Sequence, residues 1–169
     1  MRTIALALAV LVFTSCRSQD IGKEYSSYRV YKTLKKAQKS PLSVEILDLS
    51  SSRLKSLPES IGLFRNLKVL ILDRNEIGSF PDSFWTLEKL EVLVISRNGL
   101  DILPERMGEL KSLRKIYASR NNLSSIPQSI VNLKNLIRLD LSFNKLADKD
   151  GDFIRRELPQ CSVLIDVIL

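Results

Sequence analysis

Apolar residues recur through the middle of the chain with a period of 23 residues. Within one copy they occupy the first, fourth, sixth and eleventh positions of a short segment, as at Leu67, Leu70, Leu72 and Ile77. A large apolar residue followed by proline comes next in four of the copies. The residues that open successive copies are Val44, Leu67, Leu90, Leu113 and Leu136. A fixed period of this length predicts a solenoid of stacked coils.

One such coil cannot bury its own apolar face, so its leucines must pack against the coils on either side. The spacing of Leu67, Leu70 and Leu72 predicts a short strand with these side chains directed inward, and Phe84 and Leu87 are expected to close the coil across the back. A polar column follows the strands and consists of Ser52, Asn75, Asn98, Asn121 and Asn144. We expect the carboxamides to bond backbone groups of adjacent coils. The serine is interpreted as divergence of the first coil.

The pattern LxxLxLxxNxL, followed by an apolar-proline pair, is that of leucine-rich repeats, and the chain resembles this family from residue 44 to residue 146. The LPxxI element at Leu57–Ile61 and Ile126–Ile130 is similar to that of the short, 23-residue subtype. The resemblance implies an α/β solenoid: a leucine-rich-repeat arc of five coils with a parallel β-sheet on its concave face.

A solenoid also needs covers, because a bare end would expose a row of leucines to water. Residues 25–39 place Tyr28, Leu34 and Ala37 at helical spacing, with Tyr31 or Val30 between them, which predicts an N-terminal capping helix within residues 17–43. Residues 147–169 predict a C-terminal cap made of a helix and a strand. We expect Asp152 to cap that helix, Pro159 to end it, and the strand to run from Val163 to Leu169.

The first residues have the pattern of an export signal: a basic residue, then an apolar run too short to span a bilayer. Residues 1–15 are therefore interpreted as a signal peptide. Cys16 follows a small residue at the end of this run, as in the lipobox of bacterial lipoproteins, which predicts lipidation of its thiol. The expected location is an outer membrane, on its outer surface or its periplasmic face. Ordinary secretion is the alternative, and a cytoplasmic scaffold would require residues 1–16 to be retained.

Segments that flank the repeats are similar to those of leucine-rich-repeat lipoproteins of Leptospira. They are Ala37–Leu49 and Leu158–Val163. This resemblance implies an exported, membrane-attached binding protein, with host proteins or glycans as candidate partners. It assigns no catalytic residue. Besides Cys16 the chain has one more cysteine, Cys161, which is interpreted as a small buried hydrophobe of the C-terminal cap.

Two columns of strand residues that should point away from the core are unexpectedly apolar. The first is Ile46, Val69, Val92, Lys115 and Arg138, and the second is Asp48, Ile71, Val94, Tyr117 and Asp140. We expect their apolar members to face solvent on the concave side and to bind a protein partner, with Tyr117 as the anchor. The alternative is that these β-branched residues merely favour strands.

A second candidate surface is a ladder of arginines at equivalent positions of successive coils, Arg74, Arg97 and Arg120, with Asp73 before the first. Strands lie about 4.8 Å apart, so the ladder could engage repeated carboxylates or sulfates of an acidic glycan. The net charge of +7 favours anionic surfaces in the same way. Solubility alone is the alternative explanation of these charges. Nucleic acid is not expected, because no aromatic residues are interleaved with the arginines.

The residue types argue against an enzyme. The chain has no histidine, which removes the common Ser-His-Asp and Cys-His arrangements and most zinc sites. Asp48 and Asp140 lie four coils apart, about 19 Å at strand spacing, which is too far for a glycosidase pair. Residues 148–152 resemble a calcium loop, but the glycine comes too early and Pro159 stands where the bidentate glutamate is needed. No cofactor or metal is expected.

Overall fold

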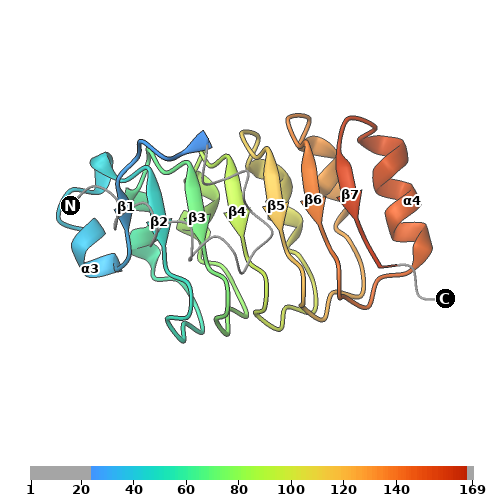
Figure 1. Cartoon of the computed structure of the whole chain (residues 1–169), viewed down its shortest axis with the longest axis horizontal. Coiled ribbons are helices and arrows are strands. Elements are labelled where there is room, and N and C mark those ends of the chain that lie inside the picture. The colour runs from blue at the N-terminus through green and yellow to red at the C-terminus, as the bar shows by residue number, and fades with distance from the viewer. Residues whose placement is uncertain (1–23, 167–169) are drawn as a thin grey trace.

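The computed structural model describes residues 24–166, which form a solenoid with a parallel sheet along one side (Figure 1). The sheet has seven strands in chain order, each hydrogen-bonded to the next. This arrangement confirms the predicted α/β solenoid with an open, parallel sheet. The strands are β1 Val30–Tyr31, β2 Ile46–Asp48, β3 Val69–Ile71, β4 Val92–Val94, β5 Lys115–Tyr117, β6 Arg138–Asp140 and β7 Ser162–Leu164.

Single turns of 3₁₀ helix form the back of the coils, behind the sheet in Figure 1. In four of them a proline in extended conformation comes directly before the first helical residue, as Pro104 does with φ of −62°. Proline fixes this φ and has no N–H to satisfy, so it suits the start of a helical turn. The turns are η1 Pro41–Ser43, η2 Glu59–Leu63, η3 Asp82–Thr86, η4 Glu105–Glu109 and η5 Gln128–Asn132.

The main core lies between the sheet and these turns. The central residue of each inner strand is fully buried, and so is an apolar residue in each of the back turns η2 to η5, such as Phe84 in η3. Leu67, Leu70 and Leu72 are all inside, as the spacing predicted. Burying one such side chain stabilises the fold by about 1.5–3 kcal/mol, and the coils share the gain because each apolar layer contacts the next.

The asparagine column forms a ladder inside the turn that follows each strand. The side-chain Oδ1 of Asn98 accepts from the N–H of Ile77 at 3.0 Å, and its Nδ2 donates to the carbonyls of Leu72 at 2.9 Å and Ile95 at 3.1 Å. In the first coil Ser52 has no such role, and its own N–H donates to Asn75 of the next coil. The predicted backbone bonding by the carboxamides is confirmed.

The N-terminal end differs from the predicted helix over residues 25–39. Helix α3 is confined to Leu34–Ala37, and residues 30–31 form strand β1 instead, paired with Ile46 and Leu47 of β2. Without β1, the edge of β2 would present unpaired N–H and C=O groups. Pairing satisfies those groups while it still buries Tyr31 and Ala37 on the first coil. The helical spacing of the apolar residues was therefore misleading here.

At the other end helix α4, Asp148–Glu157, closes the core, and β7 lies beside β6 (Figure 1). The helix begins before Asp152, so the predicted cap was wrong. Asp150 has the capping role, because its carboxylate accepts from the N–H of Ala147 at 3.0 Å. Residues 148–152 thus belong to a helix. The strand is shorter than predicted, and residues 167–169 lie outside the described part of the chain.

Two glycines of the back turns allow close approach of neighbouring coils. A Cβ on Gly108 would lie 2.5 Å from the carbonyl oxygen of Ser129, and one on Gly62 would lie 2.8 Å from the Cβ of Ser83. Distances this short are excluded for real side chains. The turns η4 and η5, and likewise η2 and η3, therefore pack at a separation that only glycine permits.

Cys161 is buried, with 7% of its surface exposed, as predicted for a small hydrophobe of the cap. Burial raises the pKa of its thiol to about 11, from an ordinary value of 9.0. Only the thiolate reacts with alkylating agents, so at pH 8 we expect alkylation of the native thiol to be slowed about 100-fold by the pKa alone. The measurement is the rate of iodoacetamide labelling in a Cys16→Ser background, with and without urea.

The same shift has a defined effect on stability. The folded chain holds the thiol proton more tightly than the unfolded chain does, so stability from this group is complete below pH 9 and declines as the pH rises toward 11.

In the labelling experiment, equal rates for the native and the urea-unfolded chain at pH 8 would contradict the burial of Cys161.

Candidate functional site

The register of the sheet aligns the two outward-pointing columns as predicted. Ile46 pairs with Val69, Val69 with Val92, and Val92 with Lys115, and the second column runs in the same way from Asp48 to Asp140. The apolar members of these columns therefore form one continuous surface on the concave side. We call this surface the apolar patch, and it consists of Ile46, Val69, Ile71, Val92, Val94 and Tyr117.

The apolar patch is not exposed to solvent, which corrects the prediction from the sequence. Each of its members is at most 6% exposed. Together with Tyr25 and Tyr28 they form a second hydrophobic cluster, separate from the main core. Residues 24–29, which we call the covering segment, lie over this face. The alternation of strand residues correctly indicated the outward direction, but it carries no information about a distant segment that packs on that side.

The contacts of the covering segment run from the second coil to β5, and its blue trace leaves β1 and passes the upper end of β2 in Figure 1. Tyr25 is the most deeply buried of its residues, at 6% exposure. Its hydroxyl donates to Glu91, directly before β4, at 2.6 Å. Burial and the neighbouring Glu91 carboxylate both raise the pKa of Tyr25, so its hydroxyl stays a hydrogen-bond donor.

Glu24 makes the ionic contacts of the covering segment. Its carboxylate lies 2.7 Å from the guanidinium of Arg114 and 2.8 Å from Nζ of Lys115. The hydrogen bond with Lys115 lowers the pKa of Glu24, and the charge of Arg114 acts in the same direction. The Lys115 side chain is only 10% exposed, and a cation with so little access to water requires a partner. Glu24 provides it.

Tyr28 completes the contacts over the second coil. Nζ of Lys68 donates to the Tyr28 hydroxyl at 3.2 Å and lies 4.7 Å from the centre of its ring. The same ammonium is 2.9 Å from the carboxylate of Glu45, and the hydrogen bond with Glu45 raises the pKa of Lys68. Glu45 and Lys68 belong to a column of residues that lies directly before the strands. The sequence analysis missed this column. Its signal was an alternation of charge at 23-residue spacing, through Glu45, Lys68, Glu91, Arg114 and then Ile137.

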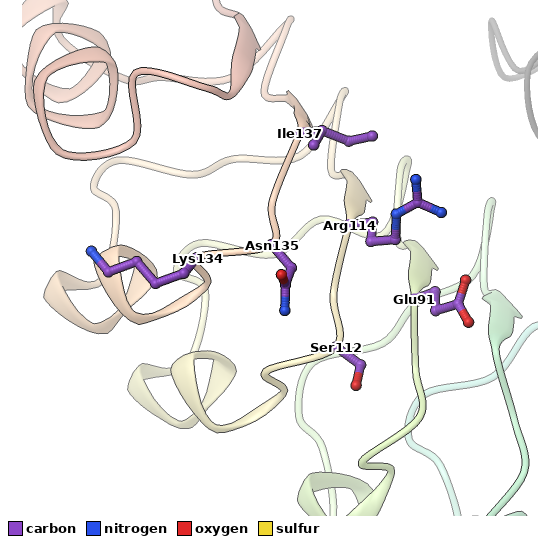
Figure 2. A pocket seen from close by; sticks show the side chains of 6 residues that line it. All are labelled: Glu91, Ser112, Arg114, Lys134, Asn135 and Ile137. Carbon is purple, nitrogen blue, oxygen red and sulfur yellow. The ribbon is translucent and has the colours of Figure 1, made fainter.

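An open pocket of about 460 Å³ lies beside the covering segment, before the starts of β4, β5 and β6. Figure 2 shows Glu91, Arg114 and Ile137 extending the same way from neighbouring strands. The lining combines one carboxylate, two cations and an apolar side chain; its residues are Glu91, Ser112, Arg114, Lys134, Asn135 and Ile137. Such a mixed lining suits recognition of a polypeptide, which carries all these types of group.

The predicted arginine ladder is present in the backbone, but its side chains have different partners. Arg74, Arg97 and Arg120 share a left-handed conformation, each with φ of 56°. The guanidinium of Arg97 makes two hydrogen bonds to the buried carboxylate of Asp73, at 2.7 and 3.1 Å. Arg120 lies 4.3 Å from the ring centre of Phe143. The three groups therefore do not form a uniform row of cations.

The acidic residues at the ends of the second column have local partners. Asp48 accepts from the N–H and hydroxyl of Ser50, and Asp140 accepts from those of Ser142. Both carboxylates thereby hold the turn that follows their strand. Within residues 24–166 no group of acidic, histidine or cysteine side chains is placed to hold a metal ion.

The predicted lipidation site, Cys16, lies outside the described residues, as does the predicted signal peptide. Across residues 24–166, no helix combines the length and the apolar character that a bilayer crossing requires.

The family model for a leucine-rich repeat region matches residues 8–152, so the chain belongs to the leucine-rich-repeat proteins. Proteins of this family are typically binding or scaffold proteins. A search of curated protein sequences finds no significant match.

Solved structures confirm the fold. A leucine-rich-repeat protein of Leptospira interrogans is similar with a TM-score of 0.67 and 33% identity, over 80% of this chain and 34% of its own. Internalin C2 of Listeria monocytogenes is similar with a TM-score of 0.66 and 26% identity, over 80% of this chain and 57% of its own. The chain thus spans about a third of the Leptospira protein and just over half of the internalin.

A third similar structure is the leucine-rich-repeat ectodomain of the plant membrane receptor kinase GASSHO1/SCHENGEN3 from Arabidopsis thaliana. It was solved in complex with Casparian strip integrity factor 2. The match has a TM-score of 0.54 and 28% identity, over 69% of this chain and 14% of the ectodomain.

Proposed function

We propose that this chain is a non-enzymatic, exported lipoprotein, anchored through Cys16, that binds a protein partner on its concave face. The observation that carries the proposal is the apolar patch. Its side chains point away from the main core, so stacking of the coils does not require them to be apolar. They already bind a stretch of polypeptide, the covering segment, through two tyrosines. A face that buries one peptide segment has the chemistry to bind another.

The anchor and the location rest on the sequence of residues 1–16, with its short apolar run and terminal cysteine. Acyl chains contribute about 0.8 kcal/mol per buried CH₂, so several chains on Cys16 would hold the protein at a membrane without a spanning helix. An outer membrane is the expected location, as for the lipoproteins that the chain resembles.

Binding of an acidic glycan to Arg74, Arg97 and Arg120 has less support. Asp73 already compensates the charge of Arg97, and Arg120 packs on Phe143. Arg74 is exposed, with its Nε 3.9 Å from the carboxylate of Asp73. A polymeric anion would therefore meet three guanidinium groups in different settings instead of three equivalent ones.

The proposal is tested by photo-crosslinking in the native cells. A photoreactive residue is placed at Ile137, which is 40% exposed at the concave pocket, or at Leu63, which is 53% exposed on the back turn η2. We expect one discrete protein adduct from Ile137 and none from Leu63. With Cys16→Ser as well, we expect the chain to leave the membrane fraction.

Adducts at Leu63 alone, or equally at both positions, would overturn binding through the concave face. Retention of the Cys16→Ser chain in the membrane fraction would overturn the lipid anchor. The comparison of two exposed apolar positions controls for nonspecific capture, because both side chains are equally able to meet a passing protein.

A further inference from the structure

We infer that the concave face recognises a partner segment in which an acidic residue precedes a tyrosine, and that residues 24–29 hold this site until such a segment displaces them. The inference rests on the proposed function and names the class of partner. It is drawn from the contacts of Glu24 and Tyr25, which show what the face accepts.

The site has an apolar part and a polar part that together select for this pair. The aromatic ring of Tyr25 packs in the cluster of the apolar patch, while its hydroxyl donates to Glu91 at 2.6 Å. Phenylalanine would fill the same space but leave the Glu91 carboxylate without this donor. The preference is therefore for tyrosine over phenylalanine, because a half-buried carboxylate that loses its hydrogen-bond donor opposes binding.

The acidic residue is selected by two cations. Arg114 and Lys115 are consecutive, and both contact the Glu24 carboxylate, at 2.7 and 2.8 Å. Lys115 is on the floor of the site, with its side chain 10% exposed. A partner without a carboxylate here would leave that ammonium buried and uncompensated. A basic residue at this position would be repelled.

The covering segment is attached in a way that another chain can reproduce. Among the residues that the structure describes, the N–H of Tyr28 donates to the carbonyl of Tyr25 within the segment itself. Glu24, Tyr25 and Tyr28 bond to residues of the coils through their side chains. Strand pairing begins only at Val30. A peptide with the same side chains can therefore replace it without a change in the sheet.

Exchange, and not simple opening, is the expected event. Departure of the covering segment alone would remove Tyr25 and Tyr28 from the cluster of the apolar patch and expose apolar surface to water, which is unfavourable. A tether this short also gives the segment an effective concentration of about millimolar at its own site. An outside segment must compete with that, so weakening the covering segment should strengthen binding in trans.

The experiment uses a fluorescent peptide with the sequence of residues 24–29, Glu-Tyr-Ser-Ser-Tyr-Arg, and the full chain. We expect Tyr25→Ala in the chain to strengthen peptide binding at least about tenfold over the unchanged chain, because the internal competitor is weakened. Adding Lys115→Glu should abolish binding. A peptide with lysine in place of its glutamate should recover part of the binding to that double variant. Circular dichroism confirms that each variant is folded.

A second measurement needs no variant. Arg29 is exposed and is the last residue of the covering segment, directly before β1, so displacement should loosen the backbone on the N-terminal side of this bond and make cleavage after Arg29 by trypsin faster. We expect saturating peptide to accelerate cleavage after Arg29 several-fold, and the lysine-containing peptide to have no such effect. A folded Tyr25→Ala chain that fails to bind the peptide would overturn the inference. Peptide binding without faster cleavage after Arg29 would overturn the displacement.

These outcomes are separable from failure of the proposed function. A protein adduct at Ile137 together with no peptide binding would leave protein recognition in place and remove only the acidic-tyrosine partner. Peptide binding that depends on Lys115, together with no adduct at Ile137, would support the specificity of the site and count against a partner in those cells.

Discussion

Asn98→Ala is expected to lower the free energy of unfolding by about 3 kcal/mol. The carboxamide donates to carbonyls of two coils and accepts from the N–H of Ile77, which is fully buried. Alanine leaves that N–H without its partner, at a cost of about 1–3 kcal/mol, and removes the donor bonds as well. The measurement is urea denaturation, followed by circular dichroism and by the fluorescence of Trp85, the single tryptophan.

Asn122→Ala is the matched control. Its side chain is partly exposed and makes one long hydrogen bond, 3.4 Å, to the carbonyl of Gly99. We expect a loss below about 0.5 kcal/mol, as for most surface substitutions. Asn98→Asp separates the acceptor role of this side chain from its donor role. Aspartate keeps an oxygen that can accept from the N–H of Ile77, but it places a second oxygen, and no donor, toward the carbonyls. Equal losses for Asn98→Ala and Asn122→Ala would show that the ladder does not stabilise the solenoid.

Gly108→Ala is expected to cost about 2 kcal/mol, within the range for overpacking of a closely packed site. The added Cβ would meet the carbonyl oxygen of Ser129 at 2.5 Å. That turn cannot easily move away, because the carboxylate of Glu105 accepts from the N–H groups of Gln128 and Ser129, each at 3.1 Å. The coils must separate locally or distort. Urea denaturation measures the loss.

Gly78→Ala serves as the control, since a Cβ at this residue would have no neighbouring atom within 4 Å and its φ is not in the left-handed region. Alanine there should be neutral or slightly stabilising, because it restricts the unfolded chain. A Gly108→Ala protein as stable as the Gly78→Ala protein would mean that the back turns are free to move apart.

The coils could be predicted from the sequence because the same physical requirement recurs in each. Every coil must bury the same layer of side chains and satisfy the same turn, so Leu70 and Asn98 have counterparts one period away. The direction of Val92 and Val94 also follows from strand alternation. At these positions the local sequence pattern is sufficient to predict the fold, because the same residue types recur every 23 residues.

Exposure of the concave face could not be predicted in the same way. Whether Val94 meets water depends on Tyr25, a residue far away in the sequence and outside the repeats. The prediction of an N-terminal capping helix over residues 25–39 was wrong for a related reason. Residues 30–31 were assigned to a helix by their spacing from Leu34, but the free edge of β2 offers hydrogen bonds that a short helix does not replace. Both errors arise where a unique segment meets the repeated part.

The path of the covering segment ties it to a particular number of coils. Its residues meet successive coils in order: Tyr28 contacts Lys68, Tyr25 contacts Glu91, and Glu24 contacts Arg114. Duplication of one whole coil between β4 and β5 would leave every repeat intact. It would nevertheless carry Arg114 about 4.8 Å away from Glu24. This chain could therefore gain coils beyond β5 without disturbing the covering segment, whereas a gain before β5 must be matched by a longer N-terminal segment.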